Sequence, residues 1–395
     1  MLPRIKISYL NGQLGTVGDS PDGLFALVCG ATAAGGTFEL EKAYSVRNMD
    51  DLAALGVTAD NNARLYKHVK EFYDEAEGGT ELVVYGVAKS TKMTALLDKN
   101  TGSARKLVEG QNGRLRGLFV AGDGGSTGSA TEGLDPDVLS ALPIAQQLAE
   151  WATEELYAPL FVILEGRGYT GDTGELRDLG ELAYNRVGIL IGDTESGSEG
   201  ACVGTLAGRL AGLPVQRNAG RVKDGALFPT EMYIGSVKVD EGGSAVAGLY
   251  DKGYITPRKY VGRSGYFFTD DRLACDETDD YAHISHRRVI DKAYRIVYDT
   301  LLDMMLDELE VNEDGTLQVG IVKSWQQSVE DALNAGMTAS GELSAGDDGA
   351  GCVCYIDQTQ NVLATSKVLV TVKVRPFGYA RYVDVSLGFQ VTQAS

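Results

Sequence analysis

The chain has 395 residues, of which 44% are hydrophobic and 23% charged, and this composition indicates a globular protein long enough for more than one domain. Its 36 basic and 55 acidic residues give a net charge of −19, which argues against nucleic acid and anionic membrane surfaces as partners. Five cysteines without a C-x-x-C pair favour reduced thiols in a cytoplasm-like compartment, and we expect neither a signal peptide nor a membrane span, because no long apolar run occurs.

The first part of the chain predicts an early strand and then a βαβ unit. Residues 3–10 alternate in hydropathy, with Ile5 and Ile7 on one face, as in a short strand. Residues 23–31 and 81–88 are apolar throughout, which favours strands buried on both faces. Between them, apolar residues recur at helical spacing over 60–79.

The same alternation of strands and helices continues from 117 to 213. The predicted elements are a strand at 117–122, a helix at 135–151, a strand at 160–166, a helix at 174–185, a strand at 187–193 and a helix at 198–213. The last helix carries Gly200, Gly204 and Gly208 at four-residue spacing. These small residues predict a close approach to a neighbouring helix.

A Gly-rich, less regular stretch reaches residue 262, and a second series of elements follows it. We predict a strand at 264–270, a long helix at about 280–309, a strand at 316–322, a helix at 324–337, a strand at 351–358 and two terminal strands at 367–375 and 381–391. No internal repeat is visible.

These patterns predict an α/β fold, with a mainly parallel sheet covered by helices on both faces, additional β elements, and extended N- and C-terminal strands. The predicted domains are an N-terminal arm strand at 1–15, an α/β body with Gly-rich insertions at 16–262, a C-terminal α/β domain at 263–365 and C-terminal arm strands at 366–395. A subdomain at about 90–215 is an option within the body.

Two short motifs raise the question of catalysis. Residues 124–128 match the G-x-S-x-G nucleophile motif around Ser126, but the next helix begins only near residue 135, whereas a nucleophile elbow needs a helix at once. His283 and His286, with Asp279 or Asp280 nearby, have a spacing that suits a metal, yet no matching second ligand cluster accompanies them. Since the Gly-rich loops also lack the phosphate-binding G-x-x-x-x-G-K-[ST] motif, we expect no enzyme activity, no cofactor and no metal site.

The chain ends in its most regular β sequence. Apolar and polar residues alternate over 367–375 and again over 381–391, on either side of Pro376-Phe377-Gly378. Two alternatives follow. The runs either form a hairpin that completes its own domain, or project as strands that pair with another copy of the chain.

Several segments together resemble the contractile tail sheath proteins of phages and related contractile injection systems. They are GLFALVCGA at 23–31, VKEFYDEAEGGTELVVYGVA at 69–88, GTLAGRLAGLPVQRNAG at 204–220 and YAHISHRRVIDKAYRIVYDTLLDMMLDELE at 281–310. The similarities are spread over most of the chain. The sequence departs from typical members at about 214–262 and in its shortened N-terminal arm.

The resemblance implies a self-assembling sheath subunit. Its copies would polymerise as stacked rings around a tail tube and contract by rigid-body rearrangement, while terminal strands exchanged between neighbours hold the lattice together. Its partners would be copies of itself, the tail tube protein, and baseplate or terminator proteins, in a virion tail sheath or in the bacterial cytoplasm where the sheath assembles.

The residues assigned to these contacts lie mainly at the chain ends. We assign strand exchange to Ile5, Ile7, Val368, Val370, Val372, Val374, Val383, Val385, Leu387 and Phe389. Because copies that each carry −19 repel one another, we assign Arg287, Arg288, Arg375 and Arg381 to ion pairs with acids on neighbours. The alternatives are a hydrolase using Ser126 or a metal at His283 and His286, and a non-contractile ring-forming binding protein.

Overall fold

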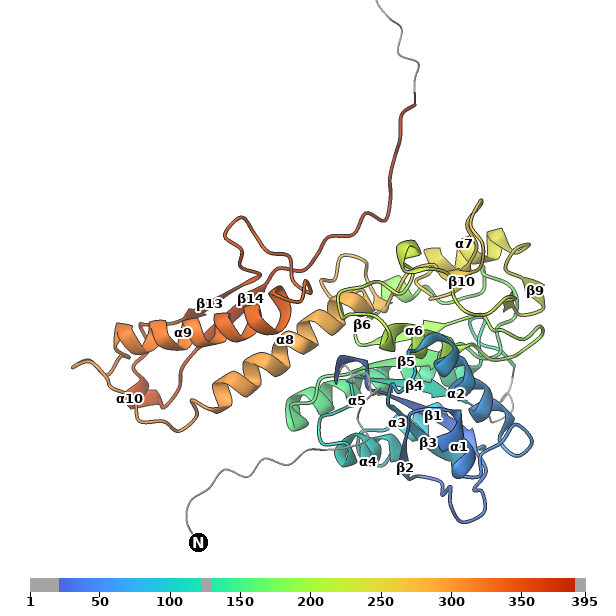
Figure 1. The fold of residues 1–395 in the computed structure, drawn as a ribbon, viewed down its shortest axis with the longest axis horizontal. Helices are drawn as coiled ribbons and strands as arrows, with labels where there is room; N and C mark the ends of the chain where they lie inside the picture. Colours follow the sequence, from blue (N-terminus) through green and yellow to red (C-terminus); the bar gives the residue numbers. More distant parts are fainter. Residues whose placement is uncertain (1–20, 123–128, 388–395) are drawn as a thin grey trace, which may run out of the picture. The chain divides into compact units, whose positions relative to one another are not determined.

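The structure, a computed structural model, describes residues 21–122 and 129–387, and the chain divides into two compact units, Met1–Asp307 and Glu308–Ser395. A six-stranded sheet in the order β2-β3-β1-β4-β5-β7 forms the centre of the first unit (Figure 1). Its strands are β1 Phe25–Ala31, β2 Ala43–Val46, β3 Leu82–Ala88, β4 Gly117–Ala121, β5 Phe161–Glu165 and β7 Val187–Leu190. Every neighbouring pair is parallel except β2 with β3. The predicted α/β fold with a mainly parallel sheet is confirmed.

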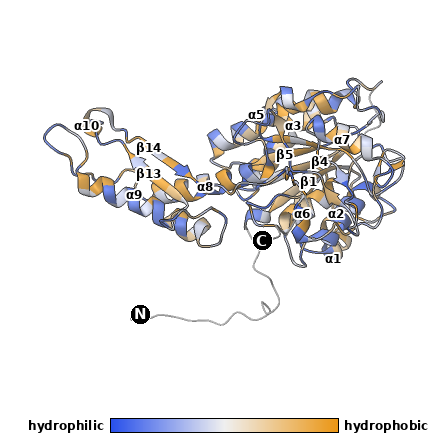
Figure 2. Ribbon diagram, turned by 90° about the horizontal axis from the view of Figure 1, so that it is seen from above, coloured by the Kyte–Doolittle hydropathy of each residue, from blue (hydrophilic) through white to orange (hydrophobic). Residues whose placement is uncertain are grey.

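Helices lie on both sides of this sheet. Figure 2 shows α3 and α5 on one side and α2 and α6 on the other, with the apolar strands between them. The described helices of the first unit are α1 Met49–Ala54, α2 Ala63–Glu75, α3 Met93–Leu97, α4 Ser103–Gly110, α5 Pro136–Leu156, α6 Val203–Ala211, α7 Gly243–Asp251 and α8 Ile284–Leu302. All residues of β1, β4, β5 and β7 are buried, as expected for strands packed on both faces.

The small residues of α6 bring its backbone against α2, which confirms the predicted close approach. A Cβ atom added at Gly204 would lie 2.1 Å from the carbonyl oxygen of His68. One added at Gly208 would lie 2.3 Å from the carbonyl oxygen of Phe72. Real Cβ atoms do not approach backbone oxygens this closely, so only glycine fits at these two positions.

Replacing Gly204 therefore tests the contact between α2 and α6. We expect Gly204→Ala to lower the free energy of unfolding by about 1–3 kcal/mol, because the methyl group forces the two helices apart. Urea unfolding measures the change. Gly110→Ala is the matched control, since Gly110 also lies in a helix but a Cβ there meets nothing within 4 Å. Equal midpoints for the two variants would contradict this account.

Short antiparallel strand pairs surround the main sheet of the first unit. They are β6 Ala183–Tyr184 with β12 Ala274–Cys275, β8 Tyr233–Ile234 with β9 Val237–Lys238, and β10 Pro257–Arg258 with β11 Phe267–Phe268. The helix predicted at 174–185 is wrong, since this segment forms one 3₁₀ turn, η2 Leu179–Glu181, and then β6. The Asp178 side chain accepts a hydrogen bond from Gly180 N, and such local bonds compete with a helix. Other 3₁₀ turns are η1 Pro21–Gly23 and η3 Val222–Asp224.

The second unit consists of two helices, a π-helical turn and a two-stranded sheet in its described part. These are α9 Val319–Leu333, the π turn η4 Asn334–Thr338, β13 Cys352–Ile356, α10 Val362–Thr365 and β14 Val370–Val374. The strand predicted at 316–322 is wrong, because α9 already begins at Val319. The buried side chains of Val322, Val329 and Leu333 follow helical spacing, and this longer pattern prevails over a short alternating run.

The division into compact units lies at Asp307 and Glu308, beyond the predicted boundary at 262 and 263. The segment between the two positions is tied to the first unit, since its strands β11 and β12 pair with β10 and β6, which precede residue 262. The predicted arm at 1–15 lies outside the described residues. Within the described part of the chain, no helix combines the length and apolarity needed to cross a bilayer.

Candidate assembly interface

The sheet of the second unit has two different edges. β13 and β14 pair antiparallel, with Cys354 opposite Val372, so each strand has one further edge of its own. On β13, Cys354 N–H donates to Glu330 Oε1 at 2.7 Å and the Cys354 carbonyl accepts from Gln326 Nε2 at 3.0 Å. Side chains of α9 thus occupy the outer hydrogen-bonding groups of β13 at Cys354.

The outer edge of β14 presents backbone groups of three valines. Arg375 N donates to Gly351 O and Asp357 N donates to Leu369 O, so the pairs at both ends of the ladder are hydrogen-bonded. Pairs alternate along an antiparallel ladder. The N–H and C=O groups of Val370, Val372 and Val374 therefore point away from β13, toward the other edge of β14, while their side chains are half-buried. This edge has the geometry to accept another strand.

Residues 376–387 follow β14 without helix or strand. The hairpin across Pro376-Phe377-Gly378 does not form, because β14 pairs with β13 instead, and the strand predicted at 381–391 stays a prediction, since residues 381–387 have no strand partner within the described chain. The side chains of Val383, Val385 and Leu387 are 73%, 76% and 97% exposed. Since no strand among the described residues pairs with this segment, its alternating apolar side chains suit pairing with another chain. Phe389, Ile5 and Ile7 lie outside the described residues.

Arg287 and Arg288 are buried within their own chain, which differs from their assignment to neighbouring copies. Arg287 donates to Asp291 Oδ1 at 2.7 Å, and Arg186 lies 3.3 Å from the same oxygen. Arg288 donates to the carbonyl oxygens of Asp22 and Leu213. Two adjacent arginines in a sequence show where positive charge lies but not whether it is exposed. In α8 both side chains are buried against residues of their own chain.

The charges of Arg186, Arg287 and Asp291 depend on one another. Burial lowers the pKa of Arg186, and the carboxylate of Asp291 opposes that shift. One buried carboxylate thus serves two buried guanidinium groups.

The other two arginines assigned to neighbours lie in the second unit. Arg375 is an exposed residue, donates to the Ala350 carbonyl and lies 3.9 Å from Asp348. Arg381 is half-buried, with its guanidinium 5.4 Å from the ring of Tyr379. Their pairing with a neighbour stays a prediction.

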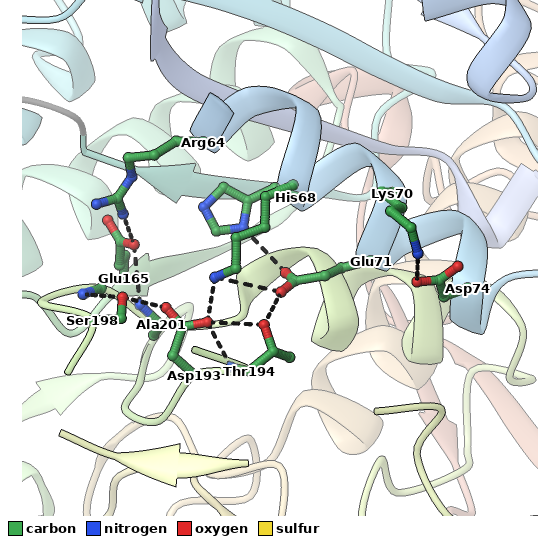
Figure 3. A network of polar contacts seen from close by, with 12 residues as sticks. Arg64, His68, Lys70, Glu71, Asp74, Glu165, Asp193, Thr194, Ser198 and Ala201 are labelled. Atoms are coloured by element: carbon green, nitrogen blue, oxygen red, sulfur yellow. Dashed lines mark hydrogen bonds and ion pairs between the residues drawn. The ribbon is translucent and has the colours of Figure 1, made fainter. Parts of the chain in front are cut away.

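A buried polar network lies where β5 and β7 end (Figure 3). The Glu165 carboxylate is fully buried and accepts from Gly122 N at 2.8 Å, from Ala201 N at 3.0 Å and from Arg64. This is the edge at which doubly wound sheets bind ligands, and here a carboxylate occupies backbone donors of the kind that hold phosphates. The network joins β5, α2 and the start of α6.

The neighbouring charges in this network are paired in the same way. Burial alone would lower the pKa of Lys67, but Glu71 and Asp193 outweigh it and raise the pKa above its usual value. Burial raises the pKa of the Cys202 thiol well above its usual range, so this cysteine is a protonated, unreactive group. These contacts hold elements together and offer no activated nucleophile. Ser126 lies outside the described residues.

His283 has different acidic neighbours from those the sequence suggested. Its Nδ1 lies 3.3 Å from Asp271 Oδ1 and 3.5 Å from Asp270 Oδ1, while its ring centre is 5.9 Å from that of His286. Asp279 instead accepts from Asn185 at 3.1 Å. Burial alone would lower the pKa of His283, and the two carboxylates raise it overall. Sequence reasoning missed Asp270 and Asp271, because only the fold brings residues 270 and 271 against the start of α8.

Solved structures share this fold over nearly the whole chain. A chain of the anti-feeding prophage (AFP) baseplate is 16% identical, with a TM-score of 0.62 and 99% of each chain covered. A chain of the contracted sheath complex of an extracellular contractile injection system, PVC, is 14% identical, with a TM-score of 0.61, and the match covers 100% of this chain and 98% of that one. The sheath tail protein of Listeria innocua is 10% identical, with a TM-score of 0.52 and coverage of 90% and 92%.

The resemblance to contractile sheath proteins is thereby confirmed in the fold. No curated protein sequence matches the chain. Two family models match it in succession, "DUF2586, N-terminal domain" over residues 2–272 and "DUF2586, C-terminal domain" over residues 280–394. Since these two models together account for almost every residue, the chain belongs to the DUF2586 family.

Proposed function

We propose that the protein is a structural sheath subunit that polymerises around a tail tube. The observation that carries the proposal is the fold shared, over nearly full length, with chains from an AFP baseplate and a contracted PVC sheath complex. The structures reported above are named for sheaths and baseplates, and none is named as an enzyme. We therefore place this chain among self-assembling proteins, with copies of itself, a tube protein and baseplate or terminator proteins as partners.

Strand exchange would link the copies through the second unit. The outer edge of β14 offers the backbone groups of Val370, Val372 and Val374, and residues 381–387 offer exposed alternating apolar side chains. A strand that adds about four to six hydrogen bonds, at about 0.5–1.5 kcal/mol net each, contributes at least about 2 kcal/mol per link. Side chains such as Val383 and Val385, which are buried on pairing, add to this.

Contraction would then need no change inside either compact unit. The first unit has a large core closed on both faces of its sheet, so it moves as a rigid body. Links made through the segment after β14, whose described residues form no helix or strand, would keep neighbours joined while the bodies rotate and move outward. Subunit contacts with two discrete arrangements supply the two states of the lattice.

Purified protein examined by negative-stain microscopy tests this function. We expect rings or tubes, and more of them as salt rises from about 0.01 M to about 0.15 M, because the Debye length falls from about 30 Å to about 8 Å and screens the repulsion between copies of charge −19. Because Arg287 and Arg288 are buried in their own chain, they are not placed to form ion pairs between copies, which added salt would have weakened.

Sedimentation velocity in the same buffers gives the assembled fraction independently. Uniform monomers at every salt concentration, in the presence of a tube protein from the same particle, would contradict the sheath function. Identical sedimentation at both salt concentrations would contradict only the electrostatic part.

A further inference from the structure

Three buried side chains converge beside the N-terminus of α8. Asp270 and Asp271 follow β11, and His283 immediately precedes α8; their exposed fractions are 5%, 0% and 4%. One oxygen or nitrogen atom from each residue lies within 4.8 Å of the others. All three residues belong to the first compact unit.

The backbone fixes these residues relative to one another. Leu273 N donates to Ala282 O at 2.8 Å, and Ile284 N donates to Asp271 O at 2.8 Å. Asp271 Oδ2 accepts from Ser285 N at 2.9 Å and so caps α8, while Asp271 Oδ1 accepts from the Asn218 amide and lies 3.3 Å from His283 Nδ1. The two segments are held in register before any ligand binds.

His283 Nδ1 is aimed into the group without a well-formed hydrogen bond. It lies 3.3 Å and 3.5 Å from the two carboxylate oxygens, yet within the described chain it has no partner that meets hydrogen-bond geometry. For an ion about 2.1 Å from all three atoms, these separations correspond to ligand–metal–ligand angles of about 104° and about 113°. Both angles are close to the tetrahedral value.

We propose that Asp270, Asp271 and His283 bind a divalent metal ion of the zinc class. An imidazole nitrogen with two carboxylate oxygens is a ligand set for Zn²⁺ or Co²⁺, whereas Ca²⁺ and Mg²⁺ take oxygen ligands. Two adjacent buried carboxylates repel each other, and a divalent ion supplies two compensating charges. Asn218 holds the carboxylates in place, since its amide contacts Asp270 and lies 2.6 Å from Asp271 Oδ1.

With three protein ligands the fourth tetrahedral position would be taken by water, and the role we assign to the ion is to hold segments of the first unit together. The ion ties the segment after β11 to the start of α8 and, through the carboxylates, to the loop of Asn218, which lies 53 residues before Asp271. The competing arrangement is a protonated His283 that neutralises one carboxylate with no metal. The two arrangements differ in metal content, which is directly measurable.

The test uses the full chain, purified without metal-affinity resin, exposed to ZnCl₂ and freed of unbound ion by gel filtration. We expect about one zinc per chain by mass spectrometry, and at least about tenfold less in His283→Gln and Asp271→Asn. His68→Gln is the matched control, because His68 is also buried in the first unit but pairs with Glu71. It should keep the wild-type zinc content.

Two readouts on the wild-type chain keep the test decisive if the variants fail to fold. Co²⁺ in place of zinc should give the intense visible absorption of a tetrahedral site, and a chelator should lower Tm. A wild-type chain that retains no zinc and shows no such absorption overturns the proposal in favour of a protonated His283. So do ligand variants that fold and bind as much zinc as the control.

Discussion

Deleting residues 379–395 is expected to abolish polymerisation while leaving the chain folded. Stopping after Gly378 keeps β14 and its contacts, including the hydrogen bond from Arg375 N to Gly351 O at 2.8 Å. The deleted residues that the structure describes form no helix or strand, so the free energy of unfolding should change by no more than about 0.5 kcal/mol. Loss of at least about 2 kcal/mol per link weakens association at least about 30-fold.

Microscopy and sedimentation velocity measure the assembled fraction of this deletion, and circular dichroism with urea unfolding checks its fold. The single substitution Val385→Asp makes the same test, since it places a charge on the apolar face of the segment and should also reduce assembly. Val261→Asp is its matched control, because Val261 is also an exposed valine but lies in the first unit. Normal tubes from the deletion would rule out the C-terminal segment as the link between copies.

Asp291→Ala is expected to destabilise the first unit by about 3–5 kcal/mol. The substitution leaves the guanidinium groups of Arg186 and Arg287 buried at 8% and 7% exposure without their shared counter-charge. Urea unfolding of the unassembled chain at low salt measures the change.

Two further variants identify the cause of that loss. Asp299→Ala lies on the same helix but is exposed, so its effect should stay within about 0.5 kcal/mol. Adding Arg287→Met to Asp291→Ala should recover part of the stability, because it removes one of the unpaired charges. If the Asp291→Ala chain is as stable as the wild type but assembles poorly, the result would instead support a role for Arg287 in contacts between subunits.

The central sheet could be predicted from the sequence because its strands carry an unambiguous pattern. β1, β4, β5 and β7 are apolar at every position, and this follows directly from packing on both faces. The spacing of Gly204 and Gly208 likewise predicts the close contact between α6 and α2, since no larger residue fits at these positions. Local pattern and tertiary structure agree in this part of the chain.

The predictions that failed depend on contacts that no local pattern contains. Alternation at 316–322 is a weaker signal than the helical spacing that continues to Leu333. The burial of Arg287 and Arg288 is decided by partners such as Asp22, more than 260 positions earlier in the chain. The strand predicted at 381–391 stays untested, because a strand needs a partner and a single copy of this chain supplies none in its described part.

The two edges of the second unit's sheet differ, and this difference limits where further strands can be added to it. Because Glu330 and Gln326 occupy the outward groups of Cys354, a strand added under the proposed exchange would find that part of β13 taken and would pair with β14 instead. If strands are exchanged as proposed, a second incoming segment would then pair with the first incoming segment rather than with the outer edge of β13. Under the proposed exchange, each second unit would then take up segments in a fixed order, which favours a regular lattice over an unlimited ribbon of strands.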